Sequence, residues 1–155
     1  MDKQITWEYK RMSVTDEVLR EQEKLLGIRL PDDFREVFIE NHGAGPVPEC
    51  YYASNGNGRN FGFLLALDKD EDGEVEFTDA NSPYMKREHN MPNEVVIFSI
   101  DPAGNFLCFD YDQLNDGYPS IIFWDHEVEG GAVKKICNTF TELLQMLHEV
   151  GDEES

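Results

Sequence analysis

A chain of 155 residues that is 40% hydrophobic and 12% aromatic is long enough to fold around a core of its own, which excludes general disorder. No apolar run reaches the roughly 18 residues of a membrane helix, and the first residues lack a signal-peptide pattern, so we expect a cytoplasmic protein that does not bind membranes. The formal net charge of −19 opposes direct binding to DNA or RNA, because contact with a polyphosphate requires lysine and arginine.

The negative charge is concentrated in the C-terminal part of the chain. Residues 1–60 hold 11 acidic and 8 basic residues, whereas residues 61–155 hold 21 acidic and 5 basic residues. A basic protein is the natural partner of such a surface, because opposite fields accelerate encounter and reject wrong partners. The alternative is that the charge only keeps the protein in solution.

The first predicted element is a helix over residues 16–26, which follows a lead-in that we expect to pack on the body through Trp7 and Tyr9. Thr15 fits the N-cap position, since its side-chain oxygen can accept a hydrogen bond from a free backbone N–H. Gly27 ends the helix, because glycine adopts the left-handed conformation without a Cβ clash. The apolar spacing predicts four inward side chains, which are Val18, Leu19, Leu25 and Leu26.

A second helix is predicted to begin at Pro31 and to end near His42. Proline is tolerated at the first helical position, where its missing N–H has no partner to lose. Its apolar stripe consists of Phe34, Val37 and Phe38, and Gly43 closes the helix. Three carboxylates on this helix are expected to lie away from the binding surface, and these are Asp32, Asp33 and Glu36.

The middle of the chain predicts one strand and one long irregular stretch. Residues 61–67 are apolar and follow a loop rich in glycine and asparagine, as expected for a strand. The stretch from Asp68 to Pro92 is acidic and is interrupted by Pro83 and Pro92. We therefore expect it to be irregular and largely exposed.

Residues 68–79 also match the spacing of an EF-hand calcium loop, in which alternating oxygens wrap the ion and a central glycine permits the sharp turn. The carboxylates of this match are Asp68, Asp70, Asp72, Glu74 and Asp79. Against calcium, the last position lacks the longer glutamate, and Pro83 interrupts the exiting helix. A solvated acidic hairpin loop is the favoured interpretation, with a calcium sensor as the alternative.

The C-terminal half predicts an antiparallel sheet with strands over residues 95–100, 106–111 and 121–124. The middle one is apolar on both alternating faces, which is typical of a strand inside a covered sheet. A last helix is predicted to begin at Thr139, whose spacing to Glu142 fits a capping box. Its inward residues are Phe140, Leu143, Leu144 and Leu147.

These elements predict one α+β domain over residues 1–150, with two N-terminal helices, a central antiparallel sheet and a C-terminal helix packed on the sheet. Residues 151–155 are expected to be an acidic, frayed tail.

The sequence predicts neither a catalytic site nor a cofactor. Asp125, His126 and Glu127 suggest a general base oriented by a carboxylate, but no nucleophile is identifiable nearby. Cys50, Cys108 and Cys137 lack the spacing of a metal site and are expected to be reduced thiols. We therefore expect a binding protein and not an enzyme.

Two aromatic residues among carboxylates are the predicted centres of a partner-binding surface, as aromatic anchors ringed by charge are common at interfaces. The predicted partner-binding residues are Asp110, Tyr111, Asp112, Asp116, Trp124, Asp125, Glu127 and Glu129. The alternative for Trp124 is a core position at the end of a strand, in which case the carboxylates around it make the contact.

The stretch from Glu23 to Gly45, with glycine, then Leu-Pro, then an aromatic helix ending in Asn-His-Gly-Ala-Gly, resembles the SUKH superfamily. That group includes fungal cell-wall-synthesis regulators and many bacterial immunity proteins. The resemblance continues through the acidic opening helix, the hairpin around Gly104, the segment Ile122–His126 and the final helix from Thr139. It covers about three quarters of the chain and is weakest between Cys50 and Pro92.

The resemblance implies an immunity protein, or antitoxin, that neutralises a toxin domain made by the same cell, often a nuclease. An acidic surface could occupy the cationic site that a nuclease presents to its substrate. The alternative that the resemblance leaves open is a regulatory or scaffold module in cell-wall or stress signalling. The fungal regulators usually carry long disordered flanks and this chain is compact, so we favour the immunity protein. We expect it to be a monomer or a weak homodimer.

Overall fold

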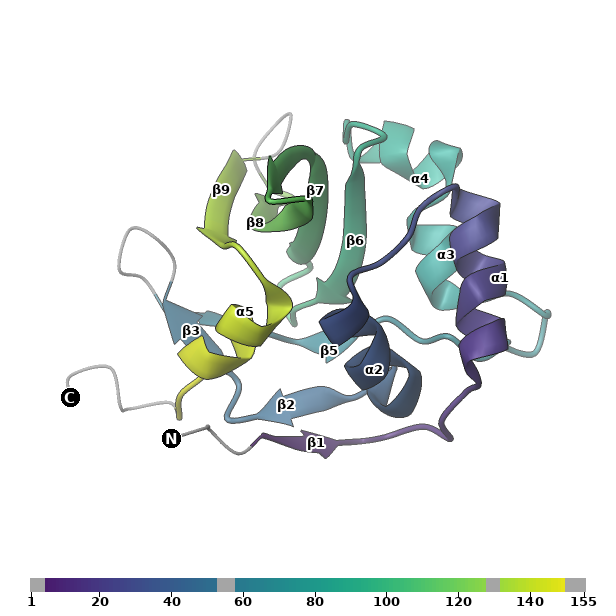
Figure 1. Ribbon diagram of the computed structural model, residues 1–155, viewed down its shortest axis with the longest axis horizontal. Coiled ribbons are helices and arrows are strands. Elements are labelled where there is room, and N and C mark those ends of the chain that lie inside the picture. Colours follow the sequence, from purple (N-terminus) through teal and green to yellow (C-terminus); the bar gives the residue numbers. More distant parts are fainter. Residues whose placement is uncertain (1–4, 53–57, 128–131, 150–155) are drawn as a thin grey trace.

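The structure is a computed structural model that describes residues 5–52, 58–127 and 132–149 (Figure 1). The described residues form five helices, which are α1 (Asp16–Leu26), α2 (Asp32–Asn41), α3 (Glu76–Ala80), α4 (Pro83–Glu88) and α5 (Phe140–Met146). The first five strands are β1 (Thr6–Glu8), β2 (Gly45–Val47), β3 (Cys50–Tyr52), β4 (Gly58–Asn60) and β5 (Phe63–Leu64). The other four are β6 (Val95–Ile100), β7 (Phe106–Asn115), β8 (Tyr118–Asp125) and β9 (Ala132–Cys137).

The predicted α+β class is confirmed. Strands β5 to β9 form one antiparallel sheet in sequence order, while β1 pairs with β2 and β3 pairs with β4 in two small sheets. Figure 1 shows α1, α3 and α4 grouped beside β6, with α2 and α5 below β6 to β9 in this view, close to β5. Strand β7 is the central strand, as its apolar residues on both faces predict.

The helix ends follow the sequence signals closely. Thr15 Oγ1 accepts a hydrogen bond from Val18 N–H at 3.3 Å, and Gly27 adopts a φ of 69° at the end of α1. Both halves of the capping box that joins Thr139 and Glu142 are present. Helix α2 begins one residue later than predicted, because Pro31 is its N-cap and not its first helical residue.

Phe34 lies at the centre of the core. Its ring centroid is 4.7 Å from that of Phe38, 5.2 Å from Phe98, 5.0 Å from Phe109 and 4.8 Å from Phe140. The residue is completely buried. These contacts join α2 to β6, β7 and α5, so the sheet and the C-terminal helix pack around one aromatic side chain.

Replacing Phe34 with alanine is expected to lower the free energy of unfolding by about 3–5 kcal/mol, because the lost contacts leave a cavity in a rigid core. Chemical denaturation of the wild type and the variant measures the difference. Phe63→Ala is the matched control, since that ring is 44% exposed and its removal costs much less. Equal losses in the two variants would contradict a core centred on Phe34.

The predicted strand over residues 61–67 is wrong in extent. The strand here, β5, consists of Phe63 and Leu64 alone, which pair with β6. Gly62 has a φ of 80°, and a Cβ atom there would lie 2.0 Å from the carbonyl oxygen of Ile100. This close approach of two backbones bends the chain and separates β4 from β5.

The prediction that residues 68–92 are irregular is wrong, since α3 and α4 lie within them, although the stretch is largely exposed as predicted. Phe77 in α3 is fully buried, with its ring 5.1 Å from that of Phe38. Pro83 stands at the start of α4 behind the N-cap Ser82, where a proline favours a helix. The residue that was interpreted as a breaker therefore begins a helix.

Two further differences concern exposure and the sheet edge. Leu25 is 68% exposed, because α1 turns Leu19, Gln22 and Glu23 inward instead. Strand β9 was not predicted, and its sequence carries adjacent lysines that discourage further pairing at this edge.

The N-terminal segment packs as predicted at Trp7, whose ring meets Phe61 at 5.8 Å. Tyr9 contacts Phe63 at 6.1 Å but is 78% exposed. Over the three described ranges, no helix combines the length and the apolar character needed to cross a membrane.

Candidate functional site

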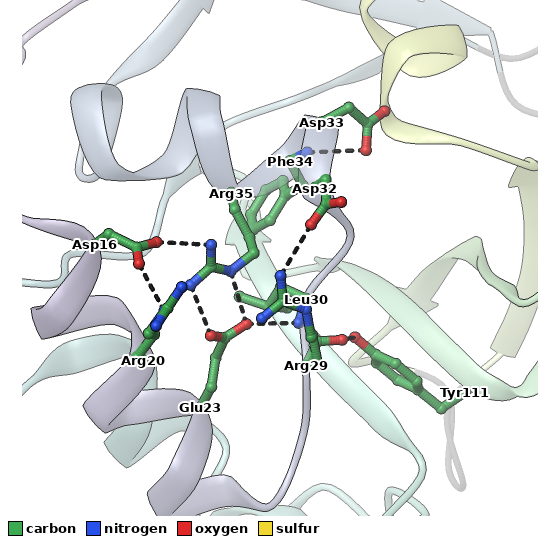
Figure 2. A network of polar contacts seen from close by, with 10 residues as sticks. All are labelled: Asp16, Arg20, Glu23, Arg29, Leu30, Asp32, Asp33, Phe34, Arg35 and Tyr111. Carbon is green, nitrogen blue, oxygen red and sulfur yellow. Dashed lines mark hydrogen bonds and ion pairs between the residues drawn. The ribbon is translucent and has the colours of Figure 1, made fainter.

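A buried ion pair between α1 and α2 holds the loop that joins the two helices (Figure 2). Glu23 and Arg35 are 5% and 8% exposed, and the Glu23 carboxylate accepts hydrogen bonds from Arg35 Nη2 at 3.0 Å and Nε at 3.1 Å. Its Oε2 atom also accepts the backbone N–H of Leu30 at 2.7 Å. The position of the loop over residues 27–31 is therefore set by one carboxylate.

Arg35 also reaches the beginning of α1. Its Nη1 atom lies 2.7 Å from Asp16 Oδ1. The hydrogen bond from Arg35 lowers the pKa of Asp16, and the hydrogen bond to Glu23 raises the pKa of Arg35. Arg35 thus stays charged while it ties α2 to two points of α1.

Two tyrosines attach the β7–β8 hairpin to this loop. The Tyr111 hydroxyl donates to the carbonyl oxygen of Arg29 at 2.6 Å, and the Tyr118 hydroxyl donates to Asp33 Oδ1 at 2.7 Å. Burial raises the pKa of both phenols, and the hydrogen bond to Asp33 raises that of Tyr118 further. Both phenols therefore remain neutral donors at physiological pH.

Asp33 connects three elements. Its Oδ2 atom accepts the backbone N–H of Thr141 at 3.1 Å and the hydroxyl of Thr141 at 2.8 Å. Its Oδ1 atom accepts the N–H of Phe34 at 2.9 Å in addition to the Tyr118 hydroxyl. With four hydrogen bonds the carboxylate is saturated. Asp33 therefore fixes α2, β8 and α5 in place and has no acceptor position left for a ligand.

A groove of about 560 Å³ lies between the loop and the hairpin. Its lining residues are Arg29, Leu30, Pro31, Asp32, Asp33, Tyr111, Asp116, Gly117, Tyr118 and Pro119. Asp32 and Asp116 contribute exposed carboxylates from opposite walls, and the rest of the lining is aromatic or apolar except for Arg29 and Asp33. Such a lining suits a side chain that is apolar along its length and cationic at its end.

The structure separates the predicted partner-binding residues into two groups. Asp110, Tyr111, Asp112 and Asp116 lie at the hairpin end of β7 and β8, where the groove is. Asp110 pairs with Ser120 on β8, and Asp125 lies five residues further along the same strand. At a rise of about 3.4 Å per residue, Asp125 is roughly 17 Å from Ser120. Asp125 and Glu127 are therefore at the opposite end of the strand.

Trp124 is 3% exposed, so the structure bears out the alternative that it is a core residue. The indole therefore presents no free face at the surface. Glu129, the last of the predicted residues, lies outside the described residues.

Eight of the ten residues that line the groove were not predicted as binding residues. Among them, Arg29 and Tyr118 were not considered, and Asp32 and Asp33 were placed outside the binding surface. The sequence signal that could have drawn attention to Asp32 is its position directly after the Leu-Pro of the loop, beside an exposed arginine. Nothing local indicates that Tyr118 lies next to α2, since it is 85 residues from Asp33.

The carboxylates of the calcium-loop match are arranged as an acidic hairpin loop, the favoured interpretation. An antiparallel bridge joins Lys69 to Val75, and Asp70 Oδ1 accepts the N–H groups of Asp72 and Glu74 at 2.9 Å each. In the part of the chain that the structure describes, no three His, Cys, Asp or Glu side chains are grouped to hold a metal ion.

The two outer carboxylates of the match have other partners. Asp68 forms an ion pair of 2.7 Å with Arg11, which lowers the pKa of Asp68. Asp79 is part of α3, and its hydrogen bond with Glu74 raises the pKa of Glu74.

Comparison with models of protein families places most of the chain in a known family. The model of the SMI1 / KNR4 family (SUKH-1) matches residues 13–146, which include both N-terminal helices, the whole sheet and α5. No curated protein matches the chain at a significant level.

Proposed function

The chain belongs to the SMI1 / KNR4 family (SUKH-1), and on that premise we propose that it is an immunity protein that binds and neutralises a basic toxin domain. The family is associated both with immunity proteins and with regulators of cell-wall synthesis. The proposal selects the first role and assigns binding, without catalysis or a cofactor, as the way in which the protein acts.

The observation that carries the proposal is an acidic groove on a rigid support. The groove is bounded by exposed Asp32 and Asp116, with Asp112 exposed nearby on the same hairpin. The elements that form it are held together by the hydrogen bonds of Tyr111, Tyr118 and Asp33. A surface that is already ordered loses little conformational entropy on binding, which favours a tight complex.

The charge of the chain supports the chemistry of the partner. A toxin that acts on nucleic acid must present lysine and arginine to its substrate. A chain with a net charge of −19 attracts such a surface over a distance and can cover it. Neutralisation would then consist of occupying the cationic site of the toxin.

The test begins with the gene immediately upstream. The C-terminal domain of the protein that this gene encodes is produced in cells with and without this chain. Better growth of the cells that contain this chain indicates protection. Affinity is then measured by calorimetry between roughly 50 and 500 mM salt, where we expect it to fall by about 10- to 100-fold because exposed charges are screened. An affinity that hardly changes would contradict the electrostatic mechanism.

The growth experiment also separates the proposal from its main alternative. A regulatory or scaffold module would have no toxic neighbour and would give no protection from one. If the folded protein gives no growth protection against the upstream toxin domain, the proposed immunity role is wrong.

A further inference from the structure

We propose that the groove between the α1–α2 loop and the β7–β8 hairpin is a binding site for a single arginine side chain of the partner protein. The inference depends on the proposed function only for the source of that arginine. The chemistry of the site is argued from the residues that line the groove and from the acceptors that they leave free.

Two carboxylates on opposite walls of the groove offer free oxygens. Asp32 has an 85% exposed side chain and uses only Oδ1, which accepts from Arg29 Nη2 at 3.2 Å. Asp116, in the hairpin turn, is exposed, and its carboxylate forms no hydrogen bond or ion pair within the three described ranges. A guanidinium group carries five N–H donors in a planar fork, so it can donate to more than one acceptor oxygen.

The groove already holds a guanidinium group, that of Arg29 on Asp32. Arg29 is 63% exposed at its side chain, so this contact is weak and exchangeable. The Tyr111 hydroxyl donates its hydrogen bond to the backbone carbonyl of Arg29 and not to the Arg29 side chain. The Arg29 side chain can therefore leave Asp32 without disturbing the hydrogen bond that holds the hairpin.

The remaining lining suits the apolar part of an arginine. Tyr111 and Tyr118 contribute rings, and Pro31 and Pro119 contribute apolar surface. Guanidinium groups stack on aromatic faces more favourably than ammonium groups, which are small and strongly hydrated.

An anionic ligand is disfavoured at the same place. Helix α2 directs its N-terminal N–H groups toward this region, but Asp32 and Asp33 occupy its first turn and offset the helix dipole. Asp33 also uses its own carboxylate to accept the N–H of Phe34.

The test uses three small probes and needs no toxin. Nα-acetyl-arginine methylamide, the lysine equivalent and the neutral citrulline equivalent are titrated into isotope-labelled protein, and amide chemical shifts are followed. We expect saturable shifts with the arginine probe at millimolar concentration, confined to residues 29–33 and 115–119. The lysine probe should bind several-fold more weakly, and the citrulline probe should produce no such shifts.

Three variants determine which groups bind the probe. Asp32→Asn and Asp116→Asn, on different walls, should each weaken arginine binding by about tenfold, since each removes a charge-assisted hydrogen bond. Arg29→Ala should strengthen it several-fold by removing the competing guanidinium. Unchanged shifts at the other amides would show that each variant keeps its fold.

Several results would overturn the inference. They are diffuse shifts that do not saturate, equal shifts with the arginine and citrulline probes, or weaker arginine binding by Arg29→Ala. Because the probes replace the toxin, failure here leaves growth protection intact. Equally, loss of growth protection leaves the probe binding unaffected, so the two proposals can fail separately.

Discussion

Changing Asp112 to lysine together with Asp116 to asparagine is expected to weaken binding of the cognate toxin by about 100-fold and to abolish protection. Both residues are exposed at the hairpin end of the sheet, beside the groove. Removing attraction and adding one repulsive charge lowers the association rate and weakens the complex. Surface changes of this kind usually alter the free energy of unfolding by less than about 0.5 kcal/mol, so the melting temperature should stay unchanged.

The choice of asparagine at position 116 has a structural reason. Asp116 has a φ of 51°, a left-handed conformation that asparagine tolerates and lysine does not. Asp110 is left unchanged because its Oδ1 atom accepts the N–H of Asp112 at 3.0 Å. The variant therefore changes charge without removing a hydrogen bond or straining the turn.

A matched control lies at the other end of the strand. Asp125→Asn with Glu127→Lys produces the same change in net charge. The asparagine can still accept the N–H of residue 127, which Asp125 Oδ1 accepts at 3.0 Å. Calorimetry at fixed salt compares the two variants, and we expect only a few-fold loss for the control.

The three possible patterns have different meanings. A large loss for the hairpin variant alone supports binding at the groove. Equal losses would mean that the total charge, and not the groove, attracts the toxin. A large loss for the control alone would place the interface at the end of the sheet near Asp125 and contradict our assignment.

Replacing Glu23 with alanine is expected to lower the free energy of unfolding by about 3–5 kcal/mol. Such a change leaves Arg35 buried without its main partner and the N–H of Leu30 without an acceptor. For a chain of this length, the melting temperature should fall by roughly 10 °C. Thermal unfolding followed by circular dichroism measures the change.

Two further variants identify the cause of that loss. Glu21→Ala changes an exposed glutamate on the same helix and should be nearly neutral. Glu23→Leu combined with Arg35→Met removes both charges and should recover much of the lost stability, because the cost comes from an unpaired buried charge. If the double variant is no more stable than Glu23→Ala, the hydrogen bond to Leu30 matters more than the charge.

The ion pair of Glu23 and Arg35 also affects the shape of the groove. Glu23 fixes the loop through Leu30, and the loop forms one wall of the groove. The stability of the helix pair and the shape of the candidate site are therefore linked through one carboxylate. A variant at Glu23 would be expected to weaken binding as well as folding.

The sequence by itself determined the elements whose signals are local. Thr15 and Gly27 set the ends of α1, and the capping box of Thr139 sets the beginning of α5. Strand β7 was assigned to the middle of the sheet because both of its faces are apolar. These features depend on backbone preferences and apolar periodicity over a few residues, which the sequence states directly.

Only the tertiary structure decided the parts that depend on distant contacts. Pro83 can end one element or begin another, and the packing of Phe77 against Phe38 favours the helices around it. The burial of Glu23 depends on Arg35, which lies 12 residues away on another helix.

The groove shows the same dependence most clearly. The hydrogen bond from Tyr111 to Arg29 joins residues that are 82 positions apart in the sequence, and the one from Tyr118 to Asp33 spans 85 positions. The hydrogen bond between Thr141 and Asp33 spans 108 positions. No local pattern encodes these pairs, because they form only when the sheet, α2 and α5 close around the shared aromatic core. For that reason the sequence indicated an acidic binding protein, whereas the fold decided which carboxylates face a groove and which are used to hold it together.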